Sequence, residues 1–356
     1  MLSVMTPLGT ILSIIRVAGL IPLIVKIVFY TKYEPKQLIL YVIYAFLGII
    51  VYFKSGLQIP IALLIFWIAI DEIPYKSIVS IYFFAGMFVG LLTIVLCILG
   101  LLPNRPIENK LALGFIHWNN PGMLSIMVML SYMMMRDKKL RLWELAVAFL
   151  ISCLINKYTK CDGAWIASLV VLIIGAAIVI KRDGVIGNVI CWFSEISFPL
   201  FFVINFIIQK LYGKVGFITN NLNEYLTGRL YLADTSLKEY GISLLGQKTN
   251  WSHLITNAAY KEGEQEIIHL VDSLYIRMMI EYGILFLLVL MILFFLLGKR
   301  CKKYKVVYMS LTVFVMALYG IVESNAISIV YNPTLIAIGY LVLKNRNKLM
   351  FEDALV

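Results

Sequence analysis

The chain contains few charged residues. Asp, Glu, Lys and Arg make up 14% of its 356 residues, whereas hydrophobic residues make up 61%. A water-soluble globule of this length needs a far larger share of polar residues to cover its surface. The composition therefore excludes an ordinary soluble protein and makes the lipid bilayer the expected solvent.

Residue types and motifs that hold metals or nucleotides are also scarce. Neither a Walker A loop nor a dinucleotide-binding glycine fingerprint occurs. The histidines and cysteines match no metal-ligand spacing and no disulfide framework. They are His117, His253, His269, Cys97, Cys153, Cys161, Cys191 and Cys301. We therefore expect no metal and no cofactor, and no ATP site.

Long apolar runs fill most of the chain. A membrane-spanning helix needs about 20 mostly apolar residues. The runs predict an all-α polytopic membrane protein with about eleven transmembrane helices. The expected helices are 8-30, 37-53, 58-70, 77-101, 119-135, 141-156, 163-180, 188-211, 272-297, 305-323 and 326-343.

Basic residues cluster in short segments between alternate helices. The formal net charge is +11, and a soluble protein with this charge would suggest nucleic acid as a partner; here the pattern follows the positive-inside rule instead. We expect these segments and the C-terminus to be cytoplasmic, in a multi-pass protein of the bacterial plasma membrane with no nucleic-acid partner. An odd number of helices places the N-terminus outside, although a run that begins at Met1 is also consistent with a further helix upstream.

The largest interruption of the membrane pattern is the segment 212-271. It divides the chain into helices 1-8 (1-211), a large extracytoplasmic loop (212-271), and helices 9-11 with a cytoplasmic tail (272-356). Loops of about this length are usually functional. Within the loop we expect an amphipathic helix over 217-240 and irregular structure around 246-266.

Arg229 is the strongest candidate for binding an anion in this loop. It lies among Leu and Tyr residues at the expected membrane surface, with Gly228 before it. A guanidinium there can pair bidentately with phosphate oxygens. The alternative is an arginine that only anchors an amphipathic helix at the interface.

A second group of charges opens the expected ninth helix. Asp272 lies at the membrane entrance, and Arg277 and Glu281 lie one and two turns deeper. Charges within a span cost about 2.5 to 3.5 kcal/mol each on insertion scales, so they are usually paired or functional. The alternative is that Asp272 caps the helix while Arg277 and Glu281 neutralise each other. His269, just before them, could accept a proton.

Shorter outer loops supply further polar candidates, although asparagine and proline at these points also suit turns. The segment "GFIHWNNPG" contains His117, Asn119 and Asn120, and "YTKCDG" contains Lys160. "VESNAISIVYNP" contains Glu323 and Asn325.

These pieces, in this order, resemble the Wzy-type O-antigen and capsular polysaccharide polymerases of the O-antigen ligase and polymerase superfamily. The matching segments are "GFIHWNNPG", "LTGRLYL" with "EYGISLLG", "VDSLYIRMMIEYGI" and "VESNAISIVYNP". Each motif is short, and the resemblance depends on their order from about residue 85 onward.

The resemblance implies a metal-independent membrane glycosyltransferase that works in exopolysaccharide synthesis. It transfers a growing glycan from undecaprenyl pyrophosphate to a lipid-linked oligosaccharide repeat unit on the outer face of the membrane. The implied pyrophosphate-binding residues are Arg229, Arg277 and Lys160. Many relatives carry a Ser-Arg pair in the short outer loop where this chain has Lys160. Asp272 or His269 would be catalytic, and His117, Asn120, Glu323 and Asn325 would bind substrate. A chain-length regulator and a flippase of the same pathway are implied partners.

Three other interpretations stay open at this point. A ligase would use the same donor with another acceptor. A transporter or flippase would move the lipid-linked unit without making a bond, but such folds usually contain related halves and discontinuous helices that meet at mid-membrane, and the sequence indicates neither. A structural or sensory membrane protein is the third.

Overall fold

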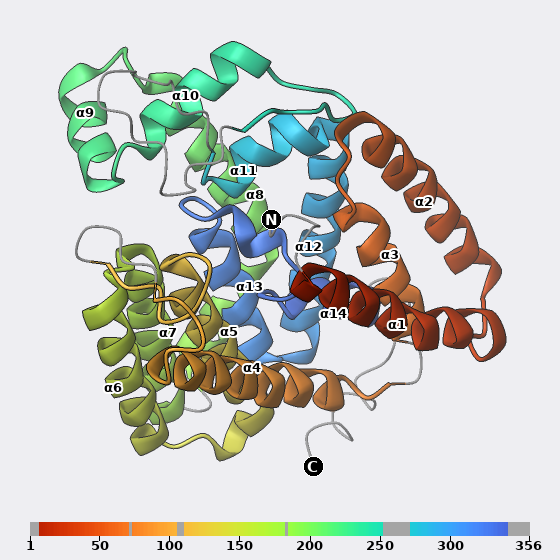
Figure 1. Ribbon diagram of the computed structural model, residues 1–356, viewed down its shortest axis with the longest axis horizontal. Coiled ribbons are helices and arrows are strands. Elements are labelled where there is room, and N and C mark those ends of the chain that lie inside the picture. Colours follow the sequence, from red (N-terminus) through yellow and green to blue (C-terminus); the bar gives the residue numbers. More distant parts are fainter. Residues whose placement is uncertain (1–6, 71–72, 105–109, 182–183, 252–270, 341–356) are drawn as a thin grey trace.

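The computed structural model describes residues 7–70, 73–104, 110–181, 184–251 and 271–340, and within these ranges every regular element is helical (Figure 1). The α-helices follow the expected order. They are α1 (Pro7–Phe29), α2 (Pro35–Ser55), α3 (Ile59–Ala69), α4 (Tyr75–Ile98), α5 (Asn119–Arg136), α6 (Leu142–Thr159), α7 (Asp162–Ile180), α8 (Val185–Leu211), α9 (Gly216–Tyr225), α10 (Arg229–Tyr240), α11 (Leu274–Arg277), α12 (Ile284–Tyr304), α13 (Val307–Tyr319) and α14 (Thr334–Ile338). The prediction of an all-α protein is confirmed.

Six of these helices are long and apolar enough to cross a membrane: α2, α4, α6, α7, α8 and α12. Their outward faces carry large exposed hydrophobic side chains, for example Phe46, Phe88 and Ile173, each more than 60% exposed. Such a surface is unfavourable in water and suits contact with lipid. The fold is that of a multi-pass membrane protein.

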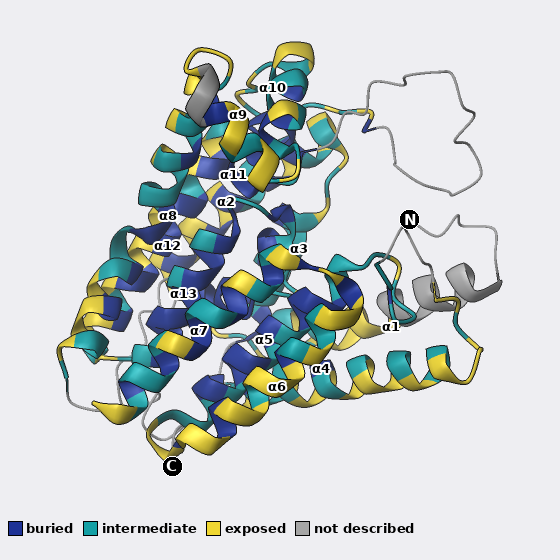
Figure 2. Cartoon of the chain, turned by 90° about the vertical axis from the view of Figure 1, so that its left-hand side faces the viewer, coloured by how far each residue is buried: buried dark blue, intermediate teal, exposed yellow. Residues whose placement is uncertain are grey.

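The centre of the bundle is α8, which packs against α12 and α13. Gly298 of α12 permits this close contact, because a Cβ atom there would lie 2.4 Å from the carbonyl oxygen of Ser194 in α8. In Figure 2 buried residues concentrate in the middle of the bundle, and exposed ones follow the outer faces of α4 and α6. Figure 1 shows α9 and α10 together at one end of the molecule.

The expected ninth span, 272-297, is not one continuous helix. It consists of α11, a π-helical turn, η2 (Met278–Tyr282), and α12, with a break at Gly283 (φ +88°). The extended segment 243–247 of the large loop satisfies the backbone at this break. Ser243 donates its N–H to the carbonyl of Met279 (3.0 Å), and its own carbonyl accepts the N–H of Ile284 (2.9 Å). The prediction of a straight span was wrong because a distant segment supplies these hydrogen bonds.

Two other expected helices are also interrupted. The amphipathic helix 217-240 is divided into α9 and α10 by Thr227 and Gly228, whose φ angles are +53° and +80°. The last span, 326-343, starts as a 3₁₀ turn, η3 (Ser324–Ile327), and becomes α-helical again only at Thr334. Pro333 disfavours helical geometry at Asn332. The side chain of Asn332 instead donates to the Ala326 carbonyl (2.8 Å) and accepts from the Thr334 N–H (3.1 Å).

Candidate functional site

An ion pair between Arg229 and Asp272 lies at the end of the bundle beside α10. Arg229 is the first residue of α10, and the left-handed conformation of Gly228 turns the chain into this helix. The Nε of Arg229 is 2.8 Å from Oδ2 of Asp272, and the two side chains are 20% and 28% exposed. Burial lowers the pKa of Arg229, but the negative charge of Asp272 and its hydrogen bond to the guanidinium raise the pKa by more. The net shift of the pKa is therefore upward. The guanidinium stays charged, and its Nη atoms are not used by Asp272 in this pair.

Two polar side chains of α8 hold the segments that carry this ion pair. Asn205 accepts a hydrogen bond from the hydroxyl of Ser273 (3.0 Å), next to Asp272, and Gln209 donates one to the carbonyl of Leu230 (3.1 Å), next to Arg229. Both are buried, and they lie one helical turn apart on the same face of α8. A single rigid helix thus positions both partners.

Glu323 lies in the turn that follows α13, and two asparagines contact its carboxylate. Asn325 donates to Oε1 (2.9 Å), and Asn119, the first residue of α5, donates to Oε2 (3.4 Å). Glu323 is 5% exposed. Burial raises its pKa to about 7, and the negative charge of Asp272 adds to the rise, while the positive charge of Arg229 opposes it. The carboxylate therefore belongs to the same electrostatic environment as the ion pair.

His117 joins this group from the loop before α5. Its Nδ1 accepts the backbone N–H of Asn119 (3.1 Å), and its ring stacks on Trp118 with 3.9 Å between centroids. Burial lowers the pKa of His117, Lys110 and Arg229 lower it further, and Asp272 partly opposes them. The imidazole is consequently neutral near pH 7, and Nε2 is the nitrogen that carries its proton.

Arg277 forms a second ion pair one layer deeper. Its Nε is 2.7 Å from Oε2 of Glu281, and its Nη1 donates to the hydroxyl of Ser324 (2.9 Å). Glu281 also accepts hydrogen bonds from Thr249 (2.9 Å) and from the indole of Trp251, both in the large loop. This pair therefore ties the loop and the turn after α13 to the π-helical turn η2.

The start of α7 lies close to Arg229. A Cβ atom on Gly163 would be 3.9 Å from Nη1 of Arg229, so glycine leaves space beside the guanidinium. Lys160, which ends α6 in a left-handed conformation, is exposed. Within the described part of the chain no hydrogen bond or ion pair joins it to Asp272 or Glu323. Lys160 lies near this layer but is not part of its contacts.

The structure thus brings together most of the residues expected from the sequence. The residues that converge come from four parts of the chain: His117 before α5, Arg229 at the start of α10, Asp272 before α11, and Glu323 and Asn325 after α13. Asp272 does not cap the following helix, since Ser273 is the N-cap of α11.

Two other expected residues, Asn120 and His269, are not among the contacts described above. The side chain that reaches Glu323 is Asn119, whereas Asn120 lies in the same first turn of α5 with its backbone N–H bonded to His117. His269 lies outside the described residues. The contributions of Asn205, Gln209 and Gly163 were not anticipated, because an ordinary polar residue or glycine in a span gives no signal of its distant partner.

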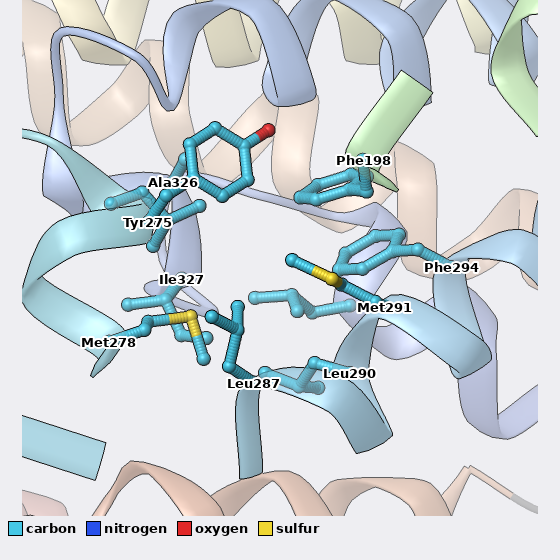
Figure 3. A pocket seen from close by; sticks show the side chains of 11 residues that line it. Phe198, Tyr275, Met278, Leu287, Leu290, Met291, Phe294, Ala326 and Ile327 are labelled. Carbon is cyan, nitrogen blue, oxygen red and sulfur yellow. The ribbon is translucent and has the colours of Figure 1, made fainter. Parts of the chain in front are cut away.

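Two cavities lie below this layer. The smaller, about 10 Å³, is enclosed by Phe198, Phe294, Met291 and Tyr275, and Figure 3 shows apolar side chains directed into it. It is large enough for no more than one water and has an apolar lining, so it is a packing defect rather than a binding site. The larger, about 370 Å³, lies between α4, α5 and α6. Its lining includes Phe115 and Pro121, which flank the His117 loop, and Ile151 farther down α6.

Taken together, fold and site define a multi-pass, all-α membrane protein with a partly buried layer of ionisable groups at one end of its bundle. Among the described residues, no group of three or more His, Cys, Asp or Glu side chains is placed to hold a metal ion. Comparison of the chain with protein-family models, curated proteins and solved structures found no match.

Proposed function

We propose that this protein is a polysaccharide polymerase of the bacterial plasma membrane. It transfers a growing glycan from polyprenyl pyrophosphate to a lipid-linked oligosaccharide repeat unit. The observation that carries the proposal is the convergence of Arg229, Asp272, Glu323 and His117 at one end of a membrane bundle. The resemblance of the surrounding motifs to Wzy-type polymerases supports the same function.

The proposed orientation places α9, α10 and the charged layer outside the cell. The basic segments at 136–141 and 299–305 and the C-terminus then lie in the cytoplasm, as the positive-inside rule requires. Besides the six long helices, we assign α1, α3, α5, α13 and the two broken segments 272-304 and 324-343 to the membrane in whole or in part. Because α12 is one of the six long helices and also part of 272-304, that segment is counted once. The total is then about eleven membrane segments.

The chemistry begins with the leaving group. When the anomeric carbon–oxygen bond breaks, negative charge develops on the pyrophosphate of the lipid carrier. A guanidinium in a partly desolvated site stabilises this charge more strongly than it would in water. Among the described residues no hydrogen bond uses the Nη atoms of Arg229, so they can bind phosphate oxygens bidentately, and Gly163 leaves space beside them. Asp272 keeps the guanidinium in place.

The donor also carries a long isoprenoid chain. The cavity between α4, α5 and α6 has apolar walls and begins beside the His117 loop. An isoprenoid chain in this cavity would place its pyrophosphate next to the charged layer. Since the donor is already activated, the transfer needs no nucleotide.

The test is deletion of the gene in its native host, followed by complementation with variants and gel analysis of surface glycan. We expect Arg229→Ala and Asp272→Asn to abolish the polymer, because each removes one partner of the ion pair, while single repeat units are still made. Lys238→Ala is the matched control. Lys238 is an exposed residue of α10 that pairs with Asp234, so its loss leaves polymer length unchanged.

The same gels separate the alternatives. Complete lipid-linked polymer that is not attached to its acceptor would indicate a ligase. Repeat units retained on the cytoplasmic face would indicate a transporter. Normal polymer from both Arg229→Ala and Asp272→Asn would refute the proposed site.

A further inference from the structure

Transfer of a glycan to a sugar hydroxyl requires a proton acceptor, and the ion-paired Asp272 is poorly suited to this role. Its Oδ2 is 2.8 Å from the Nε of Arg229. Protonation of this carboxylate would remove the negative charge that holds the guanidinium. If Arg229 holds the leaving group, Asp272 must also stay bound to Arg229 while the bond is being made.

Glu323 has the opposite environment. Among the described residues no Lys or Arg forms an ion pair with its carboxylate, and its hydrogen-bond partners are the neutral amides of Asn119 and Asn325. It is buried to 95%, and it lies close enough to the ion pair that Asp272 raises its pKa and Arg229 opposes the rise. Such a carboxylate gains from taking up a proton, because the neutral form needs no compensating charge.

The ionisable groups that face Glu323 come from several elements. They are Asp272 before α11, Arg229 of α10, Tyr319 of α13, Cys161 at the start of α7 and Tyr331 before α14. Of these only Arg229 carries positive charge, and Asp272 is its direct partner. Uptake of a proton by Glu323 therefore leaves the Arg229–Asp272 ion pair intact.

We propose that Glu323, rather than Asp272, is the general base of the glycan transfer, an inference that rests on the proposed function. The acceptor hydroxyl gives its proton to a carboxylate oxygen of Glu323, and the acceptor oxygen forms a bond to the anomeric carbon of the donor. The bond from that carbon to the pyrophosphate oxygen breaks, and the electron pair leaves with the pyrophosphate, which Arg229 holds. Asn119 and Asn325 orient the carboxylate. Release of the proton to water restores Glu323.

The experiment measures polymer formation by the purified full chain as a function of pH. Its substrate is the polyprenyl-pyrophosphate-linked repeat unit extracted from the deletion host. Because the general base must be ionised, the rate is expected to rise with pH through about 7 and then level off, and to be about ten-fold lower one pH unit below that midpoint. In Glu323→Gln, which keeps the size of the side chain, we expect a loss of about 10² to 10⁴-fold and no such midpoint.

Two further variants make the result specific. Glu323→Asp retains a carboxylate and is expected to recover part of the rate together with a pH midpoint. Glu224→Gln removes an exposed carboxylate of α9 and is expected to match the parent chain. Infrared difference spectra of parent against Glu323→Gln detect the protonated carboxyl directly, and they need no activity.

The outcomes distinguish the two proposals. If the parent chain forms no polymer from this substrate under any condition, the proposed function fails. If the parent is active and Glu323→Gln keeps its rate and pH profile, Glu323 is not the base. If Glu323→Gln is inactive but Glu323→Asp is equally inactive, while the infrared spectra show no carboxyl that titrates near 7, the inference is also overturned.

Discussion

At the residue scale, the candidate site is distinguished by two neighbouring carboxylates that have different partners. Among the described residues Asp272 has a guanidinium partner and Glu323 has amide partners alone, although both belong to one electrostatic cluster. A buried carboxylate with a raised pKa beside a charged pair is typical of sites with acid and base chemistry. A purely structural ion pair would not require the second, buried carboxylate beside it.

Arg229→Lys tests whether the geometry of the cation matters. Lysine keeps the positive charge but lacks the planar fork that can contact Asp272 and a phosphate at the same time. We expect the rate of polymer formation to fall by about a hundred-fold or more, with the amount of protein in the membrane unchanged. Activity in a purified assay and quantitative immunoblotting of membranes measure the two quantities. A lysine variant with the parent's rate would indicate that Arg229 contributes only charge.

At the element scale, the break between η2 and α12 joins the large loop to the bundle. A continuous helix through 272-297 would have no room for the extended segment 243–247, which bonds to the backbone on both sides of Gly283. The close contact has a clear steric basis. A Cβ atom on Gly283 would lie 2.5 Å from the backbone nitrogen of Gly246 and 2.6 Å from the carbonyl oxygen of Leu244. The large loop is thereby fixed to the helix that follows the Arg277–Glu281 pair.

Gly283→Ala should therefore destabilise the protein by more than the strain of a positive φ at an alanine, because the added Cβ also clashes with segment 243–247. Gly241 is a matched control, because its φ of +69° and ψ of −173° lie in the same backbone region as the φ of +88° and ψ of +152° of Gly283, but no atom lies within 4 Å of an added Cβ. We expect Gly241→Ala to lower the free energy of unfolding by about 1 to 3 kcal/mol, and Gly283→Ala by about 3 kcal/mol more. Thermal unfolding of both purified variants in detergent measures the difference. Equal shifts in the two variants would show that segment 243–247 does not pack tightly against Gly283.

At the scale of the whole molecule, the proposal requires one orientation in the membrane. Tyr225 of α9 is 86% exposed, and Lys303 at the end of α12 is also exposed. We expect a cysteine at 225 to react with a membrane-impermeant maleimide in intact spheroplasts, and a cysteine at 303 to react only after the membrane is permeabilised. The native cysteines serve as the background, since Cys161, Cys191 and Cys301 are buried. The reverse pattern would place the charged layer in the cytoplasm and exclude the proposed reaction.

The sequence predicted the positions of the helices well where a single apolar run was enough to define them. The expected 37-53, 163-180 and 188-211 differ from α2, α7 and α8 by at most three residues at either end. It failed where a helix is interrupted, either by residues within the run, as at Gly228 and Pro333, or by a distant segment, as at Gly283. Nothing in the local pattern of 272-297 indicates that segment 243–247 replaces its internal hydrogen bonds.

The candidate site was predictable as a set of residues and not as a geometry. Charged residues in an apolar background stand out in the sequence because their burial is costly, and this singled out Arg229, Asp272 and Arg277. Which polar neighbour reaches which partner depends on the rotation of each helix. Asn119 and Asn120 are equivalent in the sequence, yet adjacent residues on a helix point about 100° apart, and only Asn119 contacts Glu323.

The sequence by itself determined the solvent of this protein and the order of its helices, because transfer of an apolar run into lipid depends on the composition of that run alone. Only the tertiary structure decided that segments as far apart as 117 and 323 share one charged layer, and that Asp272 pairs with Arg229 while Glu323 has amide partners. The physical reason is that the energies of ion pairs and buried carboxylates depend on separations of a few ångströms, which the packing of distant helices sets.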